Sequence, residues 1–298
     1  MSATLTFLLI MIPGTFFLGL NDVLVRRLLR DGTRSGQLLV AFDFLTTAIL
    51  LSIPLVFFGI PELKPGFFSA ALITAVLNIF AMWGWYEAFR REEASLISPL
   101  RLITPPLVIL TGYMVLRETP SALGVVGILT TIIGLWFLVS SEAAFRDVRL
   151  REVLRRPGVL LGIAGAISFA ISFPFDKKAV VASSPLFAVV CIFAVLGLAS
   201  AFMVYLRAFA AKAELPRLHF RKDWRFFILL IFSHSLASFL SYAALNYALA
   251  AYAASVKRLW SFWAVLLSGK FLKEQNISRK LLATLVMLAG IAVTVIFG

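Results

Sequence analysis

The chain has 298 residues, of which 61% are hydrophobic and 14% are charged, and its mean hydropathy is +0.96. Soluble globular domains are about 45–50% apolar and about 25% charged, so the composition excludes an ordinary soluble protein and indicates a membrane protein. The net charge of +13 does not predict a nucleic-acid partner, because the basic segment "RDVRLREVLRR" (146–156) has no aromatic side chains among its charges. Cys191 is the only cysteine, which excludes an internal disulfide and a cysteine-based metal site.

Ten apolar runs follow one another along the chain, each about as long as a bilayer crossing. We predict that each run is a helix, because a helix satisfies its backbone hydrogen bonds within one segment. The predicted spans are 4–25, 36–58, 66–89, 94–115, 121–140, 157–176, 184–206, 225–248, 253–271 and 278–297. The first has neither a basic leading region nor an A-x-A site, so we interpret it as a retained helix and not a cleaved signal.

Basic residues are distributed unevenly between the connections. Of the 25 that lie outside the spans, 21 fall in the odd-numbered connections. The positive-inside rule places these connections in the cytoplasm, beside anionic lipid, and both termini outside. The predicted location is the cell (inner) membrane, crossed in multiple passes.

The chain repeats itself. Residues 85–134 align with residues 241–290 at a constant offset of 156 without a gap, which pairs Arg101 with Lys257 and Glu118 with Glu274. Each half holds five predicted helices, and an odd number makes the second half inverted relative to the first. We therefore predict an all-α membrane protein of ten transmembrane helices in two inverted five-helix repeats. The predicted units are 1–141, a basic connecting loop at 142–156, and 157–298.

The ends of the two repeats, "GYMVLRETPSALGVVGILTTIIG" and "GKFLKEQNISRKLLATLVMLAGI", resemble those of the EamA-type transporters of the drug/metabolite transporter superfamily. The resemblance covers essentially the whole chain. It implies a transporter of ten helices, with relatives that export amino acids and other metabolites or exchange nucleotide sugars and sugar phosphates. It also implies that both termini lie inside, in conflict with the distribution of basic residues.

A narrower resemblance concerns the organellar triose-phosphate/phosphate translocators of this superfamily. They bind the substrate phosphate through a Lys in the fourth-helix pattern K-x-x-x-P and through a Lys-Arg pair in the penultimate helix. Here "RLITP" (101–105) and "KR" (257–258) fall at those positions, with Arg in place of Lys at 101. The resemblance implies that Arg101, Lys257 and Arg258 contact an anionic substrate.

These three cations also stand out without any resemblance, because a charge near the bilayer centre costs about 2.5–3.5 kcal/mol. Inversion places the repeat equivalents Arg101 and Lys257 on opposite sides of one midplane site, with Arg258 about 100° from Lys257 around the helix. Pro105 removes the hydrogen-bond partner of the Arg101 carbonyl and predicts a local break in the helix. Arg binds carboxylates and phosphates through two hydrogen bonds and Lys as a point charge, so the three predict an anion site.

A structural role for the cations stays open. Asp43 or Glu87 could neutralise them, or their side chains could reach the membrane interface. Two carboxylates do not balance three cations, which favours an anionic ligand. Both acidic residues are also candidates for proton coupling, and so is His234, although a single histidine in a packed helix is more often structural.

Other polar and aromatic residues complete the predicted substrate site. Asn78 and His234 are repeat equivalents at helix centres and are candidates either for substrate contact or for hydrogen bonds between helices. Tyr86, Tyr242 and Trp260 either line a cavity or belong to the aromatic belts at the membrane interface.

Two further acidic residues have a simpler interpretation. Asp22 and Asp176, near equivalent helix ends, are interpreted as structural ion pairs with their neighbours Arg26 and Lys177.

The function predicted from these features is secondary-active transport of a small organic anion, phosphorylated or carboxylated, by alternating access and with exchange. The alternative is a proton-coupled exporter of amino acids or related metabolites. A membrane enzyme is disfavoured, because the sequence has only His219 and His234 and no H-E-x-x-H, G-x-S-x-G or Walker motif. We expect no cofactor, no metal and no nucleic acid, but a lipid bilayer, a small anionic substrate and a monomer or homodimer.

Overall fold

The computed structural model describes residues 2–29, 36–91, 98–140, 155–215, 218, 220–272 and 277–297, and every regular element among them is helical. The helices are α1 (Ala3–Leu29), α2 (Gly36–Phe58), α3 (Phe67–Arg91), η1 (Ser98–Ile103), α5 (Thr104–Leu116), α6 (Ala122–Ser140), α8 (Pro157–Val181), α9 (Pro185–Ala210), α10 (Phe220–Ala244), α11 (Ala250–Lys257), α12 (Leu259–Leu272) and α13 (Ile277–Phe297). The all-α prediction is confirmed. Most of the predicted connecting loop, 142–156, lies outside the described residues.

Six helices, α1, α2, α3, α8, α9 and α10, are long and apolar enough to cross a membrane. The remaining crossings use shorter apolar helices within α5, α6 and α13, together with the divided helix α11–α12. Large apolar side chains such as Phe57 and Phe58 at the end of α2 are more than four-fifths exposed. An apolar exterior of this kind fits a chain whose surroundings are hydrocarbon.

The fourth crossing, in which a break was predicted, and the ninth crossing, which was predicted as continuous, are each divided. In the fourth, the 3-10 turn η1 leads into α5, whose first turn holds Pro105, so the break predicted there is present. In the ninth, Arg258 separates α11 from α12, and its N–H donates to the Ser255 carbonyl in a 3-10 turn. The two breaks lie at nearly equivalent positions of the repeat, beside Arg101 and Lys257 respectively.

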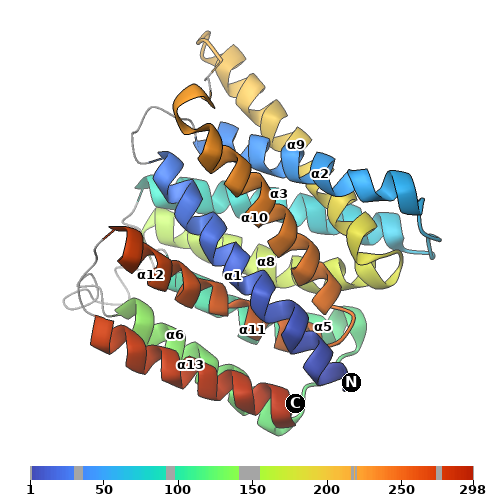
Figure 1. Cartoon of the computed structure of the whole chain (residues 1–298), viewed down its shortest axis with the longest axis vertical. Helices are drawn as coiled ribbons and strands as arrows, with labels where there is room; N and C mark the ends of the chain where they lie inside the picture. Colours follow the sequence, from blue (N-terminus) through green and yellow to red (C-terminus); the bar gives the residue numbers. More distant parts are fainter. Residues whose placement is uncertain are drawn as a thin grey trace.

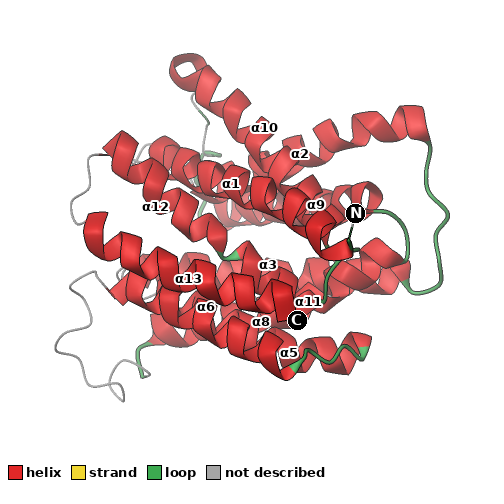
Figure 2. Ribbon diagram, turned by 60° about the horizontal axis from the view of Figure 1, so that its bottom comes forward, coloured by secondary structure: helices red, strands yellow, loops and turns green. Residues whose placement is uncertain are grey.

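The packing of the helices repeats across the two halves (Figure 1). The α3–α8 contact has its counterpart in α1–α10, and the α5–α8 contact has its counterpart in α1–α12. The pairs α2–α9 and α6–α13 each join one helix to its own equivalent, and they lie at opposite sides of the bundle. This arrangement is that of two inverted five-helix repeats, with α5, α11 and α12 of the divided crossings between the outer pairs in Figure 1. Figure 2 shows the same helical bundle from another side.

The α6–α13 pair depends on glycine. A Cβ atom added to Gly290 would lie 2.3 Å from the backbone nitrogen of Thr131, and one added to Gly127 would lie 2.3 Å from the Thr294 hydroxyl. Both helix backbones therefore approach more closely than any other residue permits, as is common where membrane helices pack tightly.

Candidate functional site

A cavity of about 360 Å³ lies between the two halves, with residues of α1, α3, α8 and α10 and both divided crossings in its wall. Small-molecule sites usually enclose about 300–1,000 Å³, so the cavity suits a small ligand. Its lining includes seven of the predicted substrate-binding residues: Arg101, Lys257, Arg258, Asn78, His234, Tyr242 and Trp260. The eighth, Tyr86, lies on α3, but its side chain is not among those the structure describes.

The helix breaks bring the three cations together. Arg101 comes from the 3-10 turn of the fourth crossing, while Lys257 and Arg258 form the carboxyl end of α11. The carbonyl groups at that end carry partial negative charge and favour cations. Arg101 and Arg258 are close enough to repel each other electrostatically, and the Arg258 Nε has no hydrogen-bond partner among the described residues.

Aromatic rings surround the same cations. The guanidinium carbon of Arg101 lies 4.8 Å from the ring centroid of Trp85 and 5.4 Å from that of Trp260. The Lys257 Nζ lies 5.5 Å from the Phe173 ring. Cation–π contacts stabilise a partly desolvated cation and leave the guanidinium edges able to donate hydrogen bonds to a ligand.

The carboxylates proposed as structural partners of these cations have other partners. Asp43 Oδ2 lies 2.9 Å from His234 Nδ1. Glu87 lies 3.5 Å from the Arg91 Nε and 3.9 Å from the Arg207 Nη2, and it is not in the cavity lining. The contacts described for Asp43 and Glu87 are thus with His234, Arg91 and Arg207.

Asp176 is a cavity residue that the sequence interpretation placed elsewhere. It accepts hydrogen bonds from the Thr74 hydroxyl at 2.6 Å and the Tyr242 hydroxyl at 3.0 Å, and it attracts Lys257 electrostatically. Its neighbour Lys177 pairs instead with Glu118, so the expected Asp176–Lys177 end pair is wrong. The spacing along the helix could have indicated that Asp176 faces the cavity, because Ser172 and Asp176 are four residues apart and therefore lie on the same helix face.

Glu118 of the first half and Lys177 of the second half link the two halves of the chain. The Lys177 ammonium forms an ion pair with Glu118 and donates to the Ala248 carbonyl at 2.7 Å. The other Glu118 oxygen accepts from the Ala250 N–H at 2.7 Å, at the start of α11. Glu274, the repeat equivalent of Glu118, lies outside the described residues.

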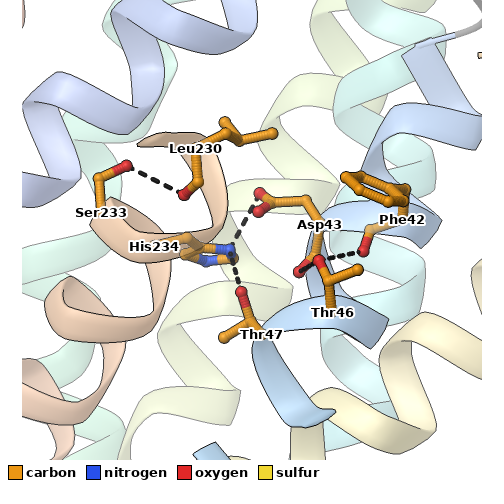
Figure 3. A network of polar contacts seen from close by, with 7 residues as sticks. All are labelled: Phe42, Asp43, Thr46, Thr47, Leu230, Ser233 and His234. Carbon is orange, nitrogen blue, oxygen red and sulfur yellow. Dashed lines mark hydrogen bonds and ion pairs between the residues drawn. The ribbon is translucent and has the colours of Figure 1, made fainter. Parts of the chain in front are cut away.

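The repeat equivalents Asn78 and His234 both line the cavity and both bond to neighbouring helices. Asn78 Oδ1 accepts from the Ser172 hydroxyl at 2.9 Å. His234 contacts Asp43, and its Nδ1 lies 3.4 Å from the Thr47 hydroxyl (Figure 3). The two roles considered for these residues are therefore compatible.

Comparisons with known proteins place this architecture in a family. The model of the EamA-like transporter family matches residues 5–140 and again residues 156–296. A solved crystal structure matches with a TM-score of 0.75 and 13% sequence identity, over 99% of this chain and 96% of the other, which shows a shared fold. No curated protein sequence matches. The chain belongs to the EamA-like transporter family, within the drug/metabolite transporter superfamily, and is a multi-pass membrane transporter of a small molecule.

Proposed function

We propose that this transporter carries a small organic anion, phosphorylated or carboxylated, by alternating access. The observation that supports the proposal is the gathering of Arg101, Lys257 and Arg258 around one cavity between the two halves. Two of these cations repel each other, and a bound anion would relieve that repulsion. Inverted repeats meeting at a central site are typical of carriers that expose this site to each side in turn.

The same charges favour exchange over a leak. When the halves close around an empty site, excess positive charge is sealed away from water, which is strongly unfavourable. A bound anion removes most of that penalty, so the loaded carrier crosses faster than the empty one. Exchange of one anion for another follows from this difference.

A proton-coupled exporter of amino acids or related metabolites is the second candidate. The observation that favours it is the presence of Asp22 and Asp176 in the same cavity as the cations. Such a site offers partners for both the carboxylate and the ammonium group of a zwitterion.

We propose that the odd-numbered connections face the cytoplasm of the cell, as the basic residues indicate. A reporter that is active only outside the cytoplasm, fused after Gly298, tests this orientation. Activity of a cytoplasmic reporter at the same position would show that both termini lie inside.

A thermal-shift screen of the purified protein against phosphorylated, carboxylated, zwitterionic and neutral metabolites tests the substrate class. A ligand at about 100 times its Kd should stabilise the protein by about 2.7 kcal/mol. Stabilisation by an anion should vanish in Lys257→Ala and in Arg101→Ala. Stabilisation by neutral or cationic compounds alone would contradict the proposal.

A further inference from the structure

We propose that the Asp43–His234 pair is a proton site coupled to the cavity, so that one proton binds together with the anion and crosses with it. The inference rests on the proposed anion site and adds to it a second, separate site. Asp43 of α2 lies outside the cavity lining, whereas His234 of α10 is part of it.

The pair is almost sealed from water. His234 is 7% exposed and Asp43 is 6% exposed, and their Nδ1 and Oδ2 atoms are 2.9 Å apart (Figure 3). The rings of Phe44 and Phe193 have their centroids 5.2 and 5.3 Å from that of the imidazole. The Asp43 Oδ1 is buried and has no hydrogen-bond partner among the described residues. Of the two partners, His234 alone is in the cavity lining.

The geometry defines where the proton binds. Because the Asp43 carboxylate is an acceptor, the facing Nδ1 carries a hydrogen and donates it, and Nε2 is the atom that gains a second proton. With a neutral imidazole the pair carries one negative charge, and with an imidazolium it carries none. A buried charge needs a partner, so the proton content of the pair depends on the charge of the cavity beside it.

The other charged groups around His234 determine that dependence. Those in the cavity lining are Asp22 of α1, Arg101 of η1, Asp176 of α8, Lys257 of α11 and Arg258 between α11 and α12, with Tyr242 of α10 as a further titratable group. From α9, which packs against α10, the lining takes the apolar residues Phe193 and Leu196. Three cations thus face two carboxylates. The ionised Asp43 beside a neutral His234 supplies a third negative charge, and protonation of His234 leaves one positive charge in excess.

Counted over these described groups of the lining and the Asp43–His234 pair, two states of the carrier are electrically balanced. One is empty with a neutral His234, and the other holds a monoanion with a protonated His234. Binding of the anion and of the proton favour each other by the same factor, because linkage between two sites is reciprocal. At low pH the empty carrier keeps the excess charge and is restricted to exchange. At higher pH the empty carrier is balanced and returns, so anion and proton cross together.

Calorimetry on the purified full-length protein tests the coupling, with sulfate and benzoate as probes because both keep their charge between pH 6 and pH 8. We expect both to bind about tenfold more tightly at pH 6 than at pH 8, a coupling within the usual range. Titrations in buffers of different ionisation enthalpy should show net proton uptake when the anion binds. In His234→Asn this uptake should vanish and the pH dependence should fall below twofold, whereas His219→Asn, at the only other histidine, should behave as the wild type.

Nuclear magnetic resonance of nitrogen-labelled histidine in the His219→Asn protein gives a readout that needs no ligand. The His234 ring signals should show protonation as the pH falls, and sulfate added at a fixed pH should increase the protonated fraction. Suppose that the anion binds without proton uptake and that Lys257→Ala abolishes this binding. This result would overturn the proton site and leave the proposed function intact. Absence of anion binding would count against the proposed function, and a His234 ring that shows no protonation as the pH falls would then also overturn the proton site.

Discussion

The two halves of this transporter place Asn78 and His234 at equivalent points of the cavity wall, but they surround them with different chemistry. Asn78 bonds to a neutral hydroxyl, that of Ser172, whereas His234 bonds to the carboxylate of Asp43 on α2. The counterpart of α2 is α9, and between Pro185 and Ala210 it contains no acidic residue. The repeat thus determines where side chains stand, while the differences between the halves determine what they bind.

The divided crossings show the same relation. Each crossing breaks beside a cation that lines the cavity, Arg101 in one half and Lys257 in the other. The second half adds Arg258, and the first half has no cation at the corresponding position, Leu102. The proposed anion site is therefore asymmetric in charge although the backbone is nearly symmetric.

The largest expected effect on anion binding comes from removing a cation from either half of the transporter. Lys257→Ala or Arg101→Ala should weaken anion binding by about 2–5 kcal/mol, as for a buried charge partner, while Arg225→Ala at the exposed end of α10 should change it less than twofold. Equilibrium binding followed by calorimetry measures all three. If only one of the two cavity variants loses binding, the site belongs to one half alone.

A smaller effect, on the free energy of unfolding, is expected where the halves meet through the equivalent helices α6 and α13. Gly290→Val should destabilise the α6–α13 pair by about 1–3 kcal/mol, because the new side chain collides with the backbone of Thr131. Ala289→Val places the same side chain on the exposed face of α13 and serves as the control. Thermal unfolding in detergent compares them, and equal stability would show that the close contact is not needed.

Asp176→Asn distinguishes the two candidate substrate classes by the sign of its effect. Loss of this negative charge beside Lys257 should tighten binding of a simple anion about tenfold, for an interaction of about 1.4 kcal/mol. A zwitterion that uses Asp176 for its ammonium group should bind more weakly instead. Calorimetry with the best anion and the best amino acid from the thermal-shift screen decides between these results.

The smallest expected effect is that of Glu87→Gln. Glu87 contacts Arg91 and Arg207, both more than a third exposed, and lies outside the cavity lining. Its removal should change transport less than twofold, because the buried Glu87 carboxylate does not line the cavity. A complete loss of transport in proteoliposomes would instead support Glu87 as a coupling residue.

The sequence was sufficient to predict the helices, the repeat and the cations of the proposed site, because each can be recognised from the order of residues along the chain alone. Apolar runs mark the crossings, a constant offset marks the repeat, and a charge such as Arg101 stands out in an apolar segment. The break at Pro105 was predictable for the same reason. The break at Arg258 was not, because "AYAASVKRLWSFW" contains neither proline nor glycine.

Ion pairs between carboxylates and cations that are distant in the chain could not be predicted from the sequence. Lys177 follows Asp176 directly, yet its ammonium reaches Glu118, far away in the chain, because neighbours on a helix point in directions about 100° apart. Asp43 pairs with His234 for the same kind of reason, across α2 and α10. Which partners meet depends on helix rotation and packing, and neither is readable from composition or spacing.

Exchange in proteoliposomes tests the central claim most directly. Vesicles containing the purified protein are loaded with the labelled anion that stabilises it best, and efflux is followed after addition of the same anion, unlabelled, outside. We predict that at pH 6, where the empty carrier keeps its excess charge, external anion accelerates efflux from wild-type vesicles, and that Lys257→Ala and Arg101→Ala abolish the acceleration. Equal efflux from wild type and both variants, or acceleration by neutral solutes alone, would contradict an anion site at Arg101, Lys257 and Arg258.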